Sequence, residues 1–289
     1  MFRPSNFPQT FPDRRRILLN KLDLPRLSIV VTERCTLKCK LCAEYSPYYK
    51  PQPHYTLKEV ETFLDEIFSI VDEVGDLSFS GGEPLLHQDL WSMIAYASKY
   101  SNRINRLLIL TNGTILPNRI YLLELQKYYS KIWNKLRFHI SDYGPALSAN
   151  ADYLCQLCEE LCIDYRRICY HGQDMFHGGW VDYGDHSKKY HTMDEIKAHA
   201  IKCAFRKDIF FVASSCRYLS RCNRATYRKY LGILPENTSD IVDIYSNVSL
   251  TEKRNQIQRL KEAKFSESCA YCNGLCDDSI RFPPAEQIK

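Results

Sequence analysis

Three cysteines at close spacing are the residues of this chain that could most clearly do chemistry. Cys35, Cys39 and Cys42 form a C-x3-C-x2-C pattern directly after the hydrophobic run Leu27–Val31. Three thiolates on one tight loop can hold three corners of a cubane 4Fe–4S cluster and leave its fourth iron open. Because open metal positions are where metal sites react, the pattern predicts a catalytic cluster. Part of a zinc site is the alternative, but a closed zinc site needs a fourth ligand.

The composition of the chain favours metal ligation or reactive thiols over disulfide bonds. The 289 residues include 13 cysteines, an odd number, and no apolar segment resembles a secretory signal or a membrane span. Hydrophobic residues make up 45% and charged residues 25%, which is typical of a globular protein with a sizeable core. The net charge of +5 is spread along the chain, which argues against a nucleic-acid footprint. We therefore predict a cytoplasmic protein that binds neither nucleic acid nor membrane.

The hydrophobic pattern predicts alternating strands and helices that would position the cysteine loop. The expected strands are 27–31, 76–80, 107–110, 136–140 and 164–169, and the expected helices are 56–72, 88–100, 118–129 and 150–162. Such alternation is typical of a parallel sheet with helices outside it. In barrels of this kind, ligand sites form at the carboxyl ends of the strands. After residue 170 the alternation stops; we expect an irregular stretch over 171–190, a hairpin over 202–222 and a helix over 250–263.

Two of these features together resemble the radical S-adenosylmethionine (radical SAM) enzymes. That family's cluster motif is C-x3-C-x2-C after the first strand, and its second strand commonly ends in a Gly-Gly-Glu type sequence, here residues 81–83. The resemblance covers about residues 27–170. It implies that the open iron binds SAM, and that an electron from the cluster cleaves SAM to a 5′-deoxyadenosyl radical, which takes a hydrogen atom from the substrate. An external one-electron reductant such as flavodoxin or ferredoxin is then an expected partner.

The resemblance also implies which residues contact SAM. Gly81 and Gly82 would let the backbone approach the ligand closely, and Glu83 would accept a hydrogen bond from the SAM ammonium group. The side chains expected at the methionine and ribose parts of SAM are those of Ser80, Asn112 and Ser141. Leu41 departs from the family, because the residue before the third cysteine is usually aromatic. Leucine keeps an apolar wall there without a ring to stack on adenine.

A second group of cysteines resembles the Twitch module, the shortened SPASM domain that holds one auxiliary 4Fe–4S cluster. The candidate ligands are Cys203, Cys222, Cys269 and Cys272. Cys203 and Cys222 flank the expected hairpin, and the other two form a C-x2-C further along the chain. Four thiolates would close the cluster and favour electron transfer over SAM binding. Structural zinc on the same cysteines is the alternative.

These parts together predict an α/β fold. We expect a partial (β/α)6 TIM-like barrel with a small C-terminal module of a β-hairpin and a helix around the auxiliary cluster. The predicted divisions are an N-terminal extension, 1–26, with a short helix near 14–22; a radical SAM barrel with its capping linker, 27–200; and a Twitch/SPASM-like module, 201–289.

Six cysteines remain when both clusters are filled. Cys155, Cys158 and Cys162 recur at helical spacing beside leucines, which is typical of buried packing residues. The candidate hydrogen-atom donors to a substrate radical are Cys169, Cys216 and Cys276. Structural or incidental use is the alternative for each of these three.

The stretch 171–190 bears on the substrate. It mixes aromatic, imidazole and carboxylate side chains, which suits a small carbohydrate-like molecule such as a sugar or an aminocyclitol. A solvated linking loop is the alternative. The expected outcome is epimerisation through a cysteine donor or dehydrogenation of an alcohol, and the spare cysteines favour epimerisation. Modification of a ribosomally made peptide, activation of a glycyl-radical protein and a non-catalytic iron–sulfur or zinc protein are the other candidates.

Overall fold

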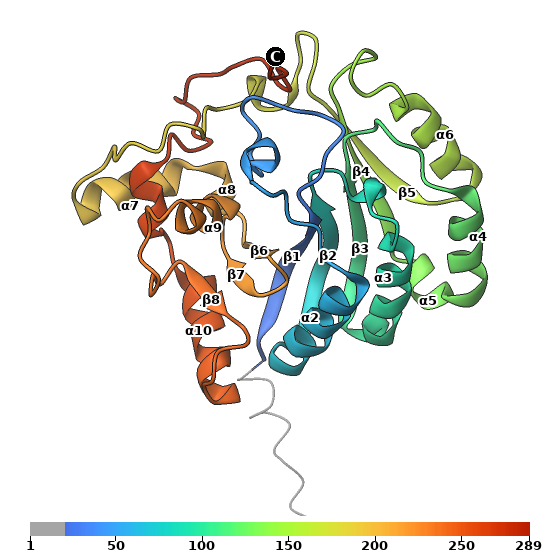
Figure 1. Cartoon of the computed structure of the whole chain (residues 1–289), viewed down its shortest axis with the longest axis horizontal. Coiled ribbons are helices and arrows are strands. Elements are labelled where there is room, and N and C mark those ends of the chain that lie inside the picture. Colours follow the sequence, from blue (N-terminus) through green and yellow to red (C-terminus); the bar gives the residue numbers. More distant parts are fainter. Residues whose placement is uncertain (1–20) are drawn as a thin grey trace, which may run out of the picture.

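A mixed sheet of eight strands forms the centre of the molecule (Figure 1). The structure is a computed structural model that describes residues 21–289, so the expected helix near 14–22 lies almost entirely outside the described residues. The strands are β1 (Asp23–Thr32), β2 (Glu73–Gly81), β3 (Ile104–Thr111), β4 (Leu136–Asp142), β5 (Asp164–Cys169), β6 (Phe210–Ser214), β7 (Tyr218–Ser220) and β8 (Ile241–Asp243). Their order across the sheet is β5-β4-β3-β2-β1-β6-β7-β8.

Helices cover the sheet along its parallel part. The helices are α2 (Leu57–Ile70), α3 (Leu90–Ala97), α4 (Arg119–Tyr128), α5 (Ser130–Trp133), α6 (Ala151–Glu160), α7 (Met193–Lys202), α8 (Ala204–Lys207), α9 (Asn223–Tyr230) and α10 (Leu250–Glu262). The predicted alternation from β1 to β5 is confirmed. Helix α2 begins with a capping box, in which Thr56 Oγ1 accepts from the Glu59 N–H at 3.3 Å and Glu59 Oε2 accepts from the Thr56 N–H at 2.7 Å.

None of the helices within residues 21–289 has the length and apolar character that a membrane span needs.

The sixth parallel strand does not continue the barrel from β5. Strand β6 pairs in parallel with β1 on the other side, with Leu27 opposite Phe211 and Ile29 opposite Ala213. All four of these residues are buried in one apolar layer, and this matched alternation sets the register. Strands β7 and β8 then add antiparallel. The barrel is therefore open, and the sheet continues from it into the C-terminal part. Helices α5, α7, α8 and α9 and strand β8 were not predicted, because these segments are short or mostly polar.

The two faces of the parallel strands differ in chemistry. The residues that face the helices are apolar and include Leu27, Ile29, Leu77, Phe79, Leu107, Ile109, Phe138 and Ile140. The alternate positions on β1 and β2 carry hydroxyl groups, and Ser28 Oγ lies 2.6 Å from Ser80 Oγ. This polar inner face leads to the carboxyl ends of the strands, where the cysteine loop begins.

Candidate functional site

The three cysteines after β1 lie on one loop at the carboxyl end of the sheet. Cys35 Sγ accepts from the Leu37 N–H at 3.4 Å, and Cys39 Sγ accepts from Gln287 Nε2 at 3.4 Å. Burial raises the pKa of Cys39 to about 11 and that of Cys42 to about 12. Buried thiolates are therefore unfavourable here unless a bound cation compensates their charge, as iron would. The three residues fit a metal cluster on this loop.

The two glycines at the end of β2 are required by a close approach of two backbones. A Cβ atom on Gly81 would lie 1.9 Å from the Thr32 carbonyl oxygen, and one on Gly82 would lie 2.4 Å from the Arg34 carbonyl oxygen. The Gly82 N–H donates to Thr32 O at 2.8 Å, and the Glu83 N–H donates to Arg34 O at 2.9 Å. These residues therefore hold the chain that enters the cysteine loop. Their predicted closeness to SAM stays a prediction.

Replacing Gly81 by alanine should lower the free energy of unfolding by about 3 kcal/mol or more. Gly81 has a φ of +142°, and the added methyl group would overlap a backbone oxygen that cannot move away cheaply. Gly172→Ala is the matched control, because Gly172 also has a positive φ (+77°) but its added methyl group would have no other atom within 4 Å. Urea unfolding of both apo variants measures the difference. Equal losses in the two variants would show that the contact with Thr32 is unimportant.

Glu83 links the ends of β2 and β3 through hydrogen bonds. Its side chain is fully buried, and its carboxylate accepts from the Leu85 N–H at 3.0 Å, the Asn112 N–H at 2.8 Å and Thr111 Oγ1 at 3.0 Å. Burial raises the pKa of Glu83 to about 7, against these three hydrogen bonds. Protein donors thus already use much of the carboxylate. The expected bond to the SAM ammonium group stays a prediction beside this structural task.

The other expected SAM contacts lie around the same strand ends. Asn112 Nδ2 donates to Thr36 Oγ1 at 3.1 Å and lies 3.5 Å from Cys35 Sγ, so this side chain reaches the cysteine loop. Ser80 lies lower on the inner face, bonded to Ser28. Ser141 lies on β4, where its carbonyl oxygen accepts from Ser148 Oγ at 3.3 Å. Of the three, Asn112 is the one that directly contacts the loop.

The four cysteines of the second group lie around one small cavity, which we call the cysteine cavity. They are Cys203, Cys222, Cys269 and Cys272. Each sulfur has a hydrogen-bond donor nearby: Leu275 N–H at 3.4 Å from Cys203, Arg224 Nη1 at 3.6 Å from Cys222, Ser266 Oγ at 3.3 Å from Cys269 and Gly274 N–H at 3.3 Å from Cys272. Donors aimed at sulfur are what thiolate ligands of a metal centre require.

Three arginines surround the cysteine cavity and were missed from the sequence. Arg206, Arg224 and Arg228 line it, and each keeps a buried guanidinium nitrogen without a hydrogen-bond partner in the described part of the chain. The Arg224 guanidinium lies 4.1 Å from the ring centre of Tyr183 and 4.3 Å from that of Phe205. Buried cations with unused donors fit an anionic four-thiolate metal centre. The sequence feature that could have identified them is the i,i+4 spacing of Arg224 and Arg228 in the residues that follow Cys222.

The three candidate hydrogen-atom donors lie in three different places. Cys169 lies beside Asp142 and His171. Its side chain is on the opposite side of β5 from the neighbouring residues that line the cavity beside the cysteine loop. Cys216 is packed in the main apolar core. Cys276 is buried with its Sγ 4.0 Å from His199 Nδ1. None of these three thiols is among the described residues that line the cavity beside the cysteine loop.

The helical cysteines are only partly as expected. Cys155 and Cys158 are buried in the core, in agreement with the prediction. The prediction for Cys162 was wrong, because its side chain is exposed. Helix α6 ends at Glu160, and Cys162 adopts a positive φ of 54° in the turn before β5. The cysteines and leucines therefore keep their helical spacing in the sequence beyond the residue at which the helix ends.

A cavity of about 420 Å³ lies between the two groups of cysteines, and we call it the barrel cavity. Leu41 and Ala43 of the cysteine loop form one wall. Tyr183 and Phe205 form another, and the same two side chains also line the cysteine cavity. The remaining lining comes from strands and from the stretch after β5: Arg26, Tyr143, Arg166, Tyr170, Phe176, His177, Gly179, Trp180, Val181, Ala204, Asp208, Phe210 and Leu275.

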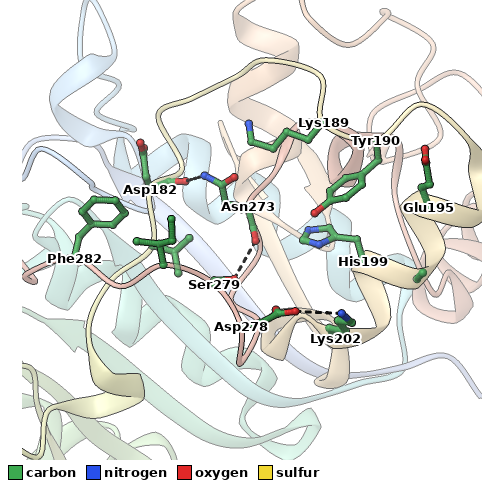
Figure 2. A pocket seen from close by; sticks show the side chains of 13 residues that line it. Asp182, Lys189, Tyr190, Glu195, His199, Lys202, Asn273, Asp278, Ser279 and Phe282 are labelled. Atoms are coloured by element: carbon green, nitrogen blue, oxygen red, sulfur yellow. Dashed lines mark hydrogen bonds and ion pairs between the residues drawn. The ribbon is translucent and has the colours of Figure 1, made fainter.

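A larger cavity of about 820 Å³ lies on the other side of Val181 and is shown in Figure 2. His199 lines both this cavity and the cysteine cavity. The His199 ring stacks on that of Tyr190, with the centres 4.4 Å apart (Figure 2). A Cβ atom on Gly274 would lie 2.7 Å from the His199 ring, so only glycine allows this packing.

Comparison with known proteins gives a family match for part of the chain. The model of the radical SAM superfamily matches residues 29–136. The GTP 3′,8-cyclase of Aquifex aeolicus (strain VF5) is 34% identical over 112 residues, which is 37% of this chain and 34% of that protein. The GTP 3′,8-cyclase of Campylobacter jejuni subsp. doylei is 37% identical over 93 residues, which is 32% of this chain and 28% of that protein. The chain thus matches about a third of the length of these curated relatives.

Solved structures are similar at low identity. The crystal structure of BtrN in complex with AdoMet and 2-DOIA is 16% identical, with a TM-score of 0.49 over 90% of this chain and 98% of that one. The crystal structure of Streptococcus suis SuiB bound to S-adenosylmethionine is 12% identical, with a TM-score of 0.42 over 98% of this chain and 83% of that one. The superfamily's cofactors are SAM and a 4Fe–4S cluster, for which Cys35, Cys39 and Cys42 have the required spacing. Residues 29–136 of this chain therefore form a radical SAM domain.

Proposed function

We propose that the protein is a radical SAM dehydrogenase that oxidises an alcohol group of a carbohydrate-like small molecule. The observation that carries this proposal is the position of the barrel cavity. Its walls include Leu41 and Ala43 of the cysteine loop on one side and Tyr183 and Phe205 on the other. Since those two aromatic side chains also line the cysteine cavity, a bound substrate would lie between the two groups of thiols.

Each group of cysteines would hold one 4Fe–4S cluster in this proposal. Cys35, Cys39 and Cys42 would hold the SAM-binding cluster, and Cys203, Cys222, Cys269 and Cys272 would hold the auxiliary one. When bound, SAM and its cluster supply an acceptor for a hydrogen atom, and the auxiliary cluster supplies an acceptor for one electron. The arginines of the cysteine cavity favour that second task, because buried cations stabilise added negative charge.

The lining of the barrel cavity suits a polyhydroxylated substrate such as a sugar or an aminocyclitol. Tyr143, Tyr170, Phe176 and Trp180 offer aromatic faces for stacking. Arg166 lies 5.9 Å from the Phe176 ring centre and makes no ion pair within residues 21–289, so its donors are available to substrate oxygens.

His177 is the proposed general base. It lines the barrel cavity, and burial lowers its pKa below the ordinary histidine value. The imidazole is therefore neutral at neutral pH and can accept the proton of a substrate hydroxyl. The substrate loses a hydrogen atom from carbon, a proton from the hydroxyl and one electron, and it becomes a carbonyl compound. The reductant would supply the one electron that SAM cleavage consumes, and the auxiliary cluster would accept the one electron that the oxidation releases.

Epimerisation, which the spare cysteines favoured, now has less support. A donor thiol must reach the substrate radical, and Cys169, Cys216 and Cys276 are all outside the barrel-cavity lining. Cys216 in particular lies in the apolar core at 4% exposure.

A nucleotide substrate is the second candidate. Its support is the name of the relatives, GTP 3′,8-cyclase, together with the aromatic and arginine lining of the barrel cavity. The matched part of those relatives covers only about a third of their length. The superfamily model matches residues 29–136, which include the cysteine loop but none of the residues beyond 170. We also keep the cytoplasmic location within the proposal, because reduced cysteines and iron–sulfur clusters persist in a reducing compartment.

The test is incubation of the reduced, reconstituted holoenzyme with SAM in heavy water. The candidate substrates are aminocyclitols, sugars and GTP. We expect a product lighter by two hydrogen atoms, formed in step with 5′-deoxyadenosine and without solvent deuterium on carbon. Alanine at Cys169, Cys216 or Cys276 should leave that product unchanged. Deuterium at an inverted carbon, lost in one of these variants, would replace dehydrogenation by epimerisation. If GTP were the one candidate substrate that gave a product, the nucleotide substrate would be favoured.

A further inference from the structure

The chain segment 282–288 lies against the cysteine loop, far from it in sequence. Cys39 and Gln287 form an antiparallel bridge. The Lys40 N–H donates to Glu286 O at 2.7 Å, and the Ile288 N–H donates to Lys38 O at 2.8 Å. Figure 1 shows this segment, in red, passing over the end of the sheet beside the loop that follows β1. The cysteine loop is thus one strand of a small ladder, and residues 286–288 are the other.

The other end of this segment is also fixed. Phe282 forms an antiparallel bridge with Trp180, with N–H to O distances of 2.8 and 2.9 Å. Trp180 lines the barrel cavity. The segment is therefore anchored at both ends, which limits the movement of the side chains between them.

The Gln287 side chain is held in one orientation. Its Oε1 accepts from the Lys38 N–H at 2.7 Å. Its Nε2 donates to Ala285 O at 2.6 Å and to Cys39 Sγ at 3.4 Å. Because a backbone N–H can only donate, the bond from Lys38 identifies the amide oxygen, and the NH₂ group must face the sulfur. Both amide hydrogens and the oxygen are thus used.

The chemistry of this contact follows from the charge on a ligating sulfur. A hydrogen bond to a cluster thiolate stabilises the more negative, reduced cluster, and such bonds help to set reduction potentials. Cys35 receives its donors from Leu37 and Asn112, at the strand ends. For Cys39, the donor comes from a residue 248 positions further along the chain.

We propose that Gln287 is a positioning residue that raises the reduction potential of the SAM-binding cluster through its bond to Cys39. This inference goes beyond the dehydrogenase proposal and does not depend on it, since it requires only the superfamily's own cluster. It also assigns residues 282–288 to the SAM site, although no motif marks them.

The test is a redox titration of the full-length holoenzyme, followed by electron paramagnetic resonance. The signal to follow is the one that changes when SAM is added. Gln287→Glu keeps an oxygen for the Lys38 N–H but replaces the NH₂ that faces sulfur by an acceptor. Glu286→Gln is the matched control, because the Glu286 side chain is half-exposed and faces Lys40 at 3.6 Å.

We expect the equilibrium constant for reduction to fall about tenfold in Gln287→Glu, which is about 59 mV for one electron. Gln287→Leu should shift the potential in the same direction, and Glu286→Gln should leave it unchanged. A lower unfolding midpoint with an unchanged potential in both Gln287 variants would overturn the proposal and leave Gln287 a purely structural clamp.

A second measurement does not depend on whether a variant folds. In the unmutated protein with ¹⁵N in its glutamine side chains, pulsed electron paramagnetic resonance of the SAM-responsive cluster should detect one weakly coupled ¹⁵N nucleus. Absence of this coupling would also overturn the proposal. Neither readout depends on turnover, so failure to find a dehydrogenated product leaves this test intact.

Discussion

Cys42→Ala will form no measurable 5′-deoxyadenosine from SAM, a loss of roughly a thousandfold or more. Cys42 is one of the three proposed ligands, on a loop that has no further cysteine at motif spacing. Its backbone is fixed by bonds from its own N–H to Cys39 O and from the Tyr45 N–H to its carbonyl oxygen, at 3.3 and 3.1 Å. A neighbouring thiol therefore cannot take its place. Bound iron should fall from about eight to about four atoms per chain, since each cubane has four.

The control for this prediction is Cys158→Ala. Cys158 is a buried cysteine that lies in α6 within the apolar core, away from the cysteine loop. It should keep both its iron and its SAM cleavage. Anaerobic iron quantitation and chromatography of 5′-deoxyadenosine give the two readouts. If Cys42→Ala retained a tenth of the cleavage rate, the assignment of this cysteine as a ligand would fail. A fall from about four irons to none would keep that assignment and remove the second cluster.

Arg228→Met should lose the auxiliary iron and destabilise the apoprotein by about 3 kcal/mol or more. Arg228 is fully buried, and its guanidinium donates to Ser268 O at 2.9 Å, Ser268 Oγ at 2.7 Å and Tyr271 O at 2.7 Å. These acceptors lie on either side of Cys269 and directly before Cys272. Without the cation they would be buried and unpaired, and the two cysteines would lose their fixed position.

Lys229→Met is the matched control for Arg228. Lys229 is the next residue of α9, and its Nζ donates to Glu236 Oε2 at 2.6 Å, away from the cysteine cavity. Arg228→Met should still cleave SAM, because the cysteine loop is untouched, whereas its dehydrogenated product should disappear. Iron content, urea unfolding of the apoprotein and product analysis measure these effects. Full auxiliary iron in Arg228→Met would show that α9 does not organise the cysteine cavity.

The sequence was sufficient for the parts of the site that depend on local spacing. The cysteine loop, the glycines at the end of β2 and the capping box at Thr56 are each defined within a few residues, so they could be predicted. The four cysteines of the second group were also identified, although only the structure brings them to one cavity.

The parts that could not be predicted depend on contacts between distant segments. Strand β6 joins β1 rather than β5 because of a register between residues far apart in the chain, and no local pattern encodes that choice. Arg224 lies in a helix of low hydrophobicity that would ordinarily be exposed, yet it is buried between two aromatic rings. Which way Cys169 points depends on the register of β5 against β4, which places Cys169 opposite Asp142.

The ladder between residues 38–40 and 286–288 also bears on how the protein matures in the cell. Chains are synthesised from the amino end, so the cysteine loop leaves the ribosome long before Gln287 does. Strand β6, which completes the pairing of β1, also comes late. Until then the loop has its three thiols but neither its full sheet nor its covering segment. We therefore expect the SAM-binding site to accept iron and sulfide most readily in the nascent or partly folded chain, and the last residues to close over a cluster that is already in place.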